Sequence, residues 1–329
     1  MKLSTLGYCA LILPLIWVTG DAAIASNFIG REFRVEVTGN SPTTLEGVHN
    51  FRLLAIKTCV DEDGNKYPCP RPSINLQLIP HLISPRDTAL LNEKPTLRWN
   101  ALPGATRYRV KVRREDEGEV IWETQVSTSE VVYAGEALKP GIDYLLIIEA
   151  DNGRSSEEES LPGRGFRLLE APVALRVRQE IEQLRQQGMT DKEEALAVAE
   201  LYYKSKLRAE AIETLERLIT GGIEDAKVYR RLGDYYRRVG VLLVAQRRYL
   251  KAVKLAVGGE REEEAAAKAG LGAVYTRLGN NEQAVRWLTE ARDIYIELRD
   301  NTDLKDGQRV QQLERRIQQL EEQLRQLNS

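Results

Sequence analysis

The chain has 329 residues, which leaves room for two or three domains. Its content of 42% hydrophobic and 29% charged residues is ordinary for a folded protein with exposed helices. The formal net charge is −2 and the pI is near 6.0, so composition gives no general attraction toward nucleic acid or an anionic membrane.

The first 25 residues have the pattern of an export signal. A positive start at Lys2 precedes an apolar core at residues 11–18 (LILPLIWV), and the triplet Ala-Ile-Ala at 23–25 is a small-x-small cleavage pattern. The alternative is a membrane anchor, but the apolar run is short and is interrupted by Pro14. We therefore expect residues 1–25 to be removed, and the mature protein to be periplasmic or secreted with no membrane span.

Residues 26–79 are predicted to form a small β segment. REFRVEVTG at 31–39 alternates apolar and polar side chains, as a half-buried strand does. Cys59 and Cys69 flank a turn-like stretch, and an oxidising compartment permits a disulfide that would close this hairpin. The alternative is two free thiols.

Residues 80–169 are predicted to form a β-sandwich. Short alternating runs such as TRYRVKV and VIWETQV are separated by turn residues such as ALPGA and EDEGE. Regular short strands between Pro- and Gly-containing turns are typical of two antiparallel sheets packed face to face.

Within this segment, five residues agree in order and spacing with fibronectin type III domains. Trp99 lies on an early strand, Tyr108 on the next, and Leu138 and Pro140 precede Tyr144. The segment therefore resembles that family. The resemblance implies that the Tyr144 hydroxyl bonds back to the backbone near the preceding turn.

One predicted strand carries an unusual row of cations. With a period of two, they share one face of the strand; they are Arg107, Arg109, Lys111 and Arg113. One interpretation is a binding patch for an acidic protein or a polysaccharide. The other is a solvated outer face whose charges pair with nearby acids, such as those at 115–117.

The second half of the chain repeats one pattern three times, after a helix predicted at about 173–187. The copies begin about 34 and about 39 residues apart. Each has a small residue, a Tyr three places later, an Ala twelve places later and a large side chain four places beyond that. The small residues are Ala199, Gly233 and Gly272, and the large ones are Leu215, Tyr249 and Leu288. The pattern predicts helix pairs in which the small residue lets the second helix approach closely.

This segment, residues 172–305, resembles the tetratricopeptide repeat family. The second copy matches at Leu232, Gly233, Tyr236, Ala245, Tyr249 and Ala252, and the third at Leu271, Gly272, Tyr275, Ala284 and Ala291. The first copy is weaker, and none carries the usual late Pro. The resemblance implies an α-helical solenoid that binds a protein or peptide on its concave face.

Some family members hold a peptide carboxylate through an Asn that follows the small residue. Glu200, Asp234 and Ala273 occupy those positions here, so this binding mode is not expected. If the solenoid has its usual curvature, the groove is lined by Tyr203, Arg230, Asp234, Arg237 and Arg277. The alternative for these residues is an ordinary exposed helix face.

The C-terminal segment, 306–329, is predicted to be one further helix. Its apolar residues step alternately by three and four, which gives an a/d seam over about three heptads. The helix either caps the last repeat or pairs with a second chain as a coiled coil, which would make a homo-oligomer.

Signatures of catalysis are absent from the sequence. It contains no GxSxG, P-loop or GxGxxG motif, and its two histidines, His49 and His81, lack metal-ligand spacing. We therefore predict no catalytic residue, no cofactor and no metal site.

The function expected from these elements is a non-catalytic protein-interaction scaffold of the bacterial cell envelope. The alternative is an accessory protein that binds glycan or cell wall through the β-sandwich. An unrecognised hydrolase is a third possibility.

Overall fold

The computed structural model of the protein describes residues 78–159, 165–303 and 305–328, together with the backbone of four short strands nearer the N-terminus. The chain divides into two compact units, Met1–Thr58 and Cys59–Ser329. Strands β1 (Ala23–Ile29) and β2 (Glu32–Thr38) pair antiparallel, and β3 (Thr58–Val60) and β4 (Lys66–Pro68) form a separate two-stranded sheet. The predicted export signal and the predicted Cys59–Cys69 bridge involve side chains outside this described part.

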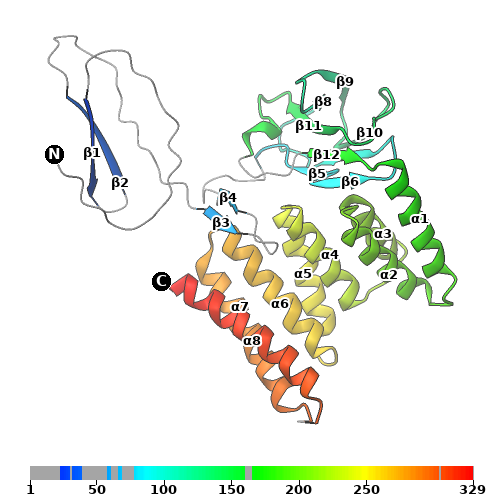
Figure 1. Cartoon of the computed structure of the whole chain (residues 1–329), viewed down its shortest axis with the longest axis vertical. Helices are drawn as coiled ribbons and strands as arrows, with labels where there is room; N and C mark the ends of the chain where they lie inside the picture. The colour runs from blue at the N-terminus through cyan, green and yellow to red at the C-terminus, as the bar shows by residue number, and fades with distance from the viewer. Residues whose placement is uncertain are drawn as a thin grey trace. The chain divides into compact units, whose positions relative to one another are not determined.

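A β region spanning residues 82–168 precedes the helices (Figure 1), as the sequence predicted. One sheet has the strand order β10-β7-β5 and the other β6-β12-β11-β8-β9. A short 3-10 helix, η1 (Ser156–Glu158), follows β11. The strands are β5 (Leu82–Ser84), β6 (Thr88–Leu90), β7 (Thr96–Trp99), β8 (Tyr108–Arg114), β9 (Val120–Val126), β10 (Glu130–Val132), β11 (Asp143–Ala150) and β12 (Gly165–Leu168).

Side chains from both sheets share one apolar core. Along β8 the residues Tyr108, Val110 and Val112 are buried while their neighbours are more exposed, because successive side chains of a strand point to opposite faces. The ring of Trp99 packs edge-on against Tyr108, with centroids 5.4 Å apart. The Tyr144 hydroxyl accepts a 2.9 Å hydrogen bond from the backbone N–H of Lys139, which is the bond that the resemblance implied.

Eight helices follow the β region (Figure 1). They are α1 (Ala171–Arg185), α2 (Asp191–Lys204), α3 (Arg208–Thr220), α4 (Ala226–Arg238), α5 (Leu242–Ala256), α6 (Arg261–Arg277), α7 (Asn281–Asp300) and α8 (Gly307–Asn328). None of these described helices has both the length and the apolarity that a bilayer span requires.

Local signals in the sequence set where these helices begin and end. The Thr190 hydroxyl accepts from the Glu193 N–H, and the Glu193 carboxylate accepts from the Thr190 N–H, so a capping box starts α2. Gly240 and Gly279 follow α4 and α6 with φ of 82° and 75°, which a side chain would disfavour. Helix α1 begins at Ala171, two residues before the predicted start.

The predicted small-to-large contacts hold the helix pairs together. A Cβ added at Gly233 of α4 would lie 2.6 Å from the ring of Tyr249 on α5, and one added at Gly272 of α6 would lie 2.5 Å from Leu288 on α7. Tyr249 also contacts the next pair, since a Cβ at Gly270 would lie 2.3 Å from its ring. Two glycines on neighbouring helices therefore enclose one fully buried tyrosine.

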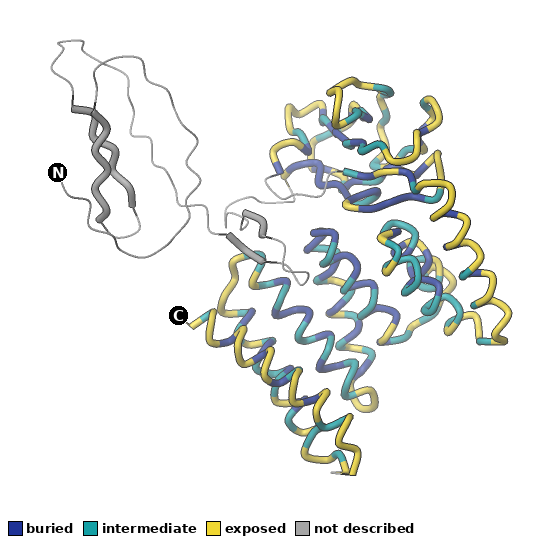
Figure 2. The backbone as a smooth tube through the Cα atoms, in the orientation of Figure 1, coloured by how far each residue is buried: buried dark blue, intermediate teal, exposed yellow. Residues whose placement is uncertain are grey.

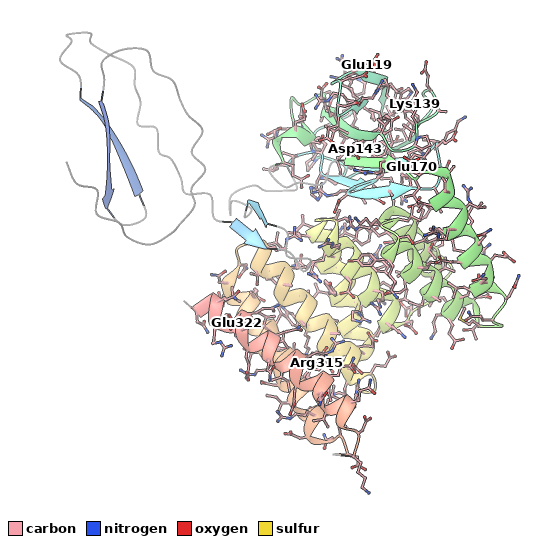
Figure 3. The ribbon with its side chains drawn as sticks, viewed as in Figure 1. Glu119, Lys139, Asp143, Glu170, Arg315 and Glu322 are labelled. Atoms are coloured by element: carbon pink, nitrogen blue, oxygen red, sulfur yellow. The ribbon has the colours of Figure 1, made fainter. Side chains whose placement is uncertain are left out.

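Helix α8 packs along α7 of the same chain, which is the arrangement of the capping alternative. Its seam residues Leu313, Ile317, Leu320 and Leu324 are buried in one cluster with α7. Burial is concentrated in α4, α5 and α6, whereas α1 and α8 each keep an exposed side (Figure 2). Charged residues such as Arg315 and Glu322 lie on that side of α8 (Figure 3).

Candidate protein-interaction surface

Helices α2, α4, α6 and α8 form a row that side chains bridge from one helix to the next. We call these four helices the inner row. Within it, α4 contacts α6 directly, in addition to its own partner α5. Glu200 of α2 lies 3.6 Å from Arg231 of α4, and Arg230 of α4 pairs with Glu263 of α6. The row continues from Glu262 of α6 to Arg309 of α8, at 3.2 Å.

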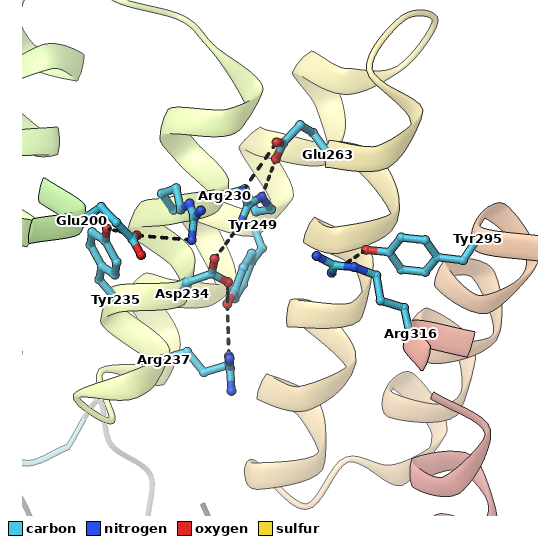
Figure 4. A network of polar contacts seen from close by, with 10 residues as sticks. Glu200, Arg230, Asp234, Tyr235, Arg237, Tyr249, Glu263, Tyr295 and Arg316 are labelled. Atoms are coloured by element: carbon cyan, nitrogen blue, oxygen red, sulfur yellow. Dashed lines mark hydrogen bonds and ion pairs between the residues drawn. The ribbon is translucent and has the colours of Figure 1, made fainter. Parts of the chain in front are cut away.

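A polar network lies at the centre of this row (Figure 4). Arg230 donates to Asp234 at 2.6 Å, and the Tyr249 hydroxyl donates to the other oxygen of Asp234 at 2.8 Å. Arg237 completes the set, since its Nε donates to the Tyr249 hydroxyl at 3.1 Å. The network ties the buried tyrosine to the surface of the inner row.

Burial and charge fix the protonation states in this network. Burial, together with the charge of Asp234, raises the pKa of the Tyr249 hydroxyl well above its usual value, so the hydroxyl stays protonated. Burial alone would lower the pKa of Arg230, but Asp234 and Glu263 outweigh it and raise the pKa. Both groups therefore remain donors across the physiological pH range.

The structure brings the five predicted groove residues onto neighbouring helices, but most of them are engaged within the chain. The Arg230 side chain is only 12% exposed and Asp234 27%. Arg277 donates to the backbone carbonyl of Arg237 at 2.8 Å. The Tyr203 ring stacks on Tyr235 of the next inner helix, with centroids 4.6 Å apart, and Tyr203 keeps part of its surface exposed.

Sequence reasoning missed the acidic partners of this row. Glu200, Glu262 and Glu263 each bridge two inner helices, and none was predicted to do so. The sequence does contain a signal for one of these pairs, because the acid Glu263 follows Arg230 by about one repeat. To use this signal, one must know how each helix is aligned with the next, and the repeat spacing gives that alignment only approximately.

The predicted cationic row lies mainly on β8. Arg109, Lys111 and Arg113 alternate with buried residues, as the period of two predicted, whereas Arg107 precedes the strand. The backbone N–H of Arg107 donates to Asp151 at 3.1 Å.

Two cations of the row face carboxylates on adjacent strands. Arg109 lies 3.4 Å from Glu123 on β9, and Lys111 lies 2.7 Å from Glu149 on β11. This is the pairing expected of a solvated outer face, although the partners come from neighbouring strands instead of the adjacent turn. A binding role for this patch stays a prediction.

Within residues 78–159, 165–303 and 305–328, no group of three or more His, Cys, Asp or Glu side chains could hold a metal ion. Trp99 is only 2% exposed, and Trp122 packs edge-on against Tyr133 at 5.1 Å. These two rings therefore contribute to packing in the β region.

Comparison with known proteins gives similarity to solved structures over less than half of this chain. No curated protein matches it. A crystal structure of MamA is 18% identical, with TM-score 0.31, over 44% of this chain and 85% of that chain. BtubC (BKLC) from P. vanneervenii is 19% identical, with TM-score 0.31, over 46% and 73%. The structure titled MamA MSR-1 C2 is 19% identical, with TM-score 0.29, over 47% and 91%.

One segment of the chain matches a family model. Residues 224–297, which contain α4, α5, α6 and most of α7, match the tetratricopeptide repeat model. The match covers the second and third copies of the repeated pattern. The helical part of the chain is thus similar to tetratricopeptide repeats.

Proposed function

We propose that this protein is a non-catalytic scaffold that binds a protein or peptide along its inner row. The observation that carries the proposal is the tetratricopeptide repeat match at residues 224–297, since such repeats generally bind other proteins. The chemistry of the inner row agrees with this role. It offers aromatic and charged groups over several successive helices and contains no recognised catalytic motif.

The pairing within the inner row indicates how a partner would be bound. Because Arg230 is largely buried and paired, it positions its neighbours and stabilises the row, and it is a weak candidate for direct contact. Tyr203 and Arg277 are only partly buried and lie on α2 and α6, the helices before and after α4 in the inner row. We assign direct contact to these two side chains, since rigid aromatics and arginines dominate protein interfaces.

We also propose that the β region is a fibronectin type III-like sandwich. Its strand order supports this: three strands form one sheet, and in the other β9, β8, β11 and β12 follow one another, with β6 parallel to β12. The hydrogen bond to Tyr144 occurs where that family has its tyrosine corner.

The proposed location is the periplasm or the cell exterior. It is supported by the charged start, the apolar core and the small-residue triplet within residues 1–25. N-terminal sequencing of protein recovered from the producing cells tests it. A mature start at Ser26 supports export, and an intact Met1 in soluble protein contradicts it.

The binding proposal is tested by affinity measurements on a partner captured from extracts of the producing cells. We expect Tyr203→Ala and Arg277→Gln each to weaken binding about 10-fold, which corresponds to about 1.4 kcal/mol. Arg247→Gln, on the exposed side of α5, is the matched control and should bind as the wild type does. Equal loss in all three variants, or none in the first two, contradicts binding along the inner row.

A further inference from the structure

The β region meets the helices along the turns that join the two helices of a pair. The backbone N–H of Ala89, on β6, donates to the carbonyl of Lys206 in the α2–α3 turn at 2.9 Å. Arg86, just before β6, donates to the carbonyl of Val239 in the α4–α5 turn. We call this interface the junction, and it covers the first two of these turns.

A buried ion pair stabilises one end of the junction. Arg86 donates to both oxygens of Glu159, at 2.8 and 2.7 Å, and neither side chain is exposed. His81 lies 3.1 Å from the same carboxylate. Burial would raise the pKa of Glu159, but its polar contacts with His81 and Arg86 outweigh burial and hold the pKa at about 2. The Glu159 carboxylate therefore stays charged across the physiological pH range.

The other end of the junction depends on a carboxyl group that lacks such partners. Glu210 of α3 accepts from the backbone N–H of Leu91 at 2.7 Å through Oε1. Its Oε2 is sealed from solvent and has no hydrogen-bond partner. Burial raises the pKa of Glu210 to about 7, against a smaller opposing effect of the Leu91 N–H.

The charged groups around Glu210 do not supply a counter-ion. Glu213 on the same helix raises its pKa further, and Tyr202 of α2 is an uncharged neighbour. The nearby cations have other partners: Arg208 pairs with Asp87 at 2.7 Å, Arg185 of α1 lies 3.5 Å from Glu194, and Arg178 of α1 donates to the Leu91 carbonyl at 3.4 Å.

Strained backbone also gathers at this end. Asp87 and Lys206 have φ of 43° and 63°, and among the described residues they are the non-glycine positions with positive φ. Each is in a conformation that side chains disfavour. At Lys206 the C-terminal cap of α2 sets this conformation, since the Lys206 and Leu207 N–H groups donate to the Tyr203 and Tyr202 carbonyls at 3.0 and 2.8 Å. The backbone carbonyl of Asp87 instead accepts from Arg208 of α3 at 2.5 Å, a contact across the junction that separation would break.

We propose that the junction is a pH-sensitive hinge, in which a proton on Glu210 closes the β region onto α3 and loss of that proton loosens it. The Arg86–Glu159 pair fastens the far end in both states. When Glu210 loses its proton, an uncompensated charge must either stay at this site or gain contact with water by separating the Glu210 carboxylate from the Leu91 N–H. The hinge thus adjusts how firmly the β region is held against the first two repeats.

Hydrogen exchange on the full chain tests the hinge. The reporters are the amides of Ala89 and Leu91, and the amides paired between β8 and β11 show the slower exchange that requires unfolding of the β region. After correction for intrinsic exchange, reporter protection in the wild type should stay below that of the β8–β11 amides and fall about 10- to 30-fold between pH 5.5 and pH 8. In Glu210→Gln, reporter protection should stay constant over this range.

The matched control is Glu213→Gln, an exposed carboxyl one turn away on the same helix. It should keep a pH dependence like that of the wild type, with the midpoint moved slightly lower because the Glu213 charge is gone. The hinge is refuted if Glu210→Gln retains that dependence, or if wild-type reporters exchange no faster than the β8–β11 amides. If Glu210→Gln does not fold, the titration of the Glu210 carboxyl group is followed by NMR in the wild type. A titration midpoint near 7 supports the hinge, and one near 4.5 overturns it. Neither readout requires a binding partner.

Discussion

The contact of Tyr249 with two glycines gives the sharpest test of how the repeats stack. The ring is fully buried, and Cβ atoms at Gly233 and Gly270 would lie 2.6 and 2.3 Å from it. Tyr249→Ala removes the ring and leaves a cavity, which should lower the free energy of unfolding by about 4 kcal/mol. Tyr249→Phe removes only the hydroxyl bonded to Asp234 and should lower it by about 1–3 kcal/mol.

Gly233→Ala should change the free energy of unfolding in opposite directions with and without the Tyr249 ring. A general loss of stability would not produce this reversal. In the wild type, Gly233→Ala forces a methyl group into the ring and should lower the free energy of unfolding by about 1–3 kcal/mol. With Tyr249→Ala in the background, the same change meets open space and should raise it by about 1 kcal/mol through helix propensity. The double-mutant cycle therefore predicts a coupling of about 2–4 kcal/mol.

Urea unfolding followed by circular dichroism at 222 nm measures all four corners of the cycle. Gly259→Ala is the control, because a Cβ there has no neighbour within 4 Å and φ is not positive. Its effect should be within about 0.5 kcal/mol. Additive effects of Gly233→Ala and Tyr249→Ala would refute the predicted packing of α4 against α5.

Three further predictions follow from other contacts. Arg86→Met leaves the buried Glu159 charge without its partner and should lower the free energy of unfolding by about 3–5 kcal/mol in urea titrations, whereas an effect under about 1 kcal/mol contradicts the buried pair. Because burial raises the pKa of Glu210 to about 7 in the folded chain, the stability that this group contributes is complete below its unfolded pKa and is lost as pH rises: the wild type should lose about 2 kcal/mol between pH 5.5 and pH 8, and Glu210→Gln should not. Removal of residues 307–328 exposes the apolar face of α7, so light scattering should show increased self-association; an association state equal to that of the full chain contradicts the capping role of α8.

The repeated pattern predicted the local packing because it is a property of helix faces. The spacing of Gly233 from Tyr249, and of Gly272 from Leu288, places a small residue opposite a large one once two helices pair. The same spacing could not reveal that Gly270 also contacts Tyr249, because that contact joins two different pairs. It depends on how one repeat sits on the next.

The junction was not predictable from the sequence. Arg86 and Glu159 are far apart along the chain, the first just before β6 and the second just after the 3-10 helix η1, so no periodicity links them. Glu210 appears in the sequence as one more acid on an amphipathic helix, and only its contact with Leu91 distinguishes it from the exposed Glu213. On β8 the alternation predicted which cations share a face, but the pairing register between strands decides that Lys111 meets Glu149.

Site-specific photo-crosslinking in the producing cells tests the central claim, that partners bind along the inner row, most directly. A photoreactive phenylalanine analogue replaces Tyr203 in one variant and Arg247, on the exposed side of α5, in the other. The proposed function predicts a discrete protein adduct from position 203 and none from position 247. An adduct from position 247 alone, or equal adducts from both, would contradict it.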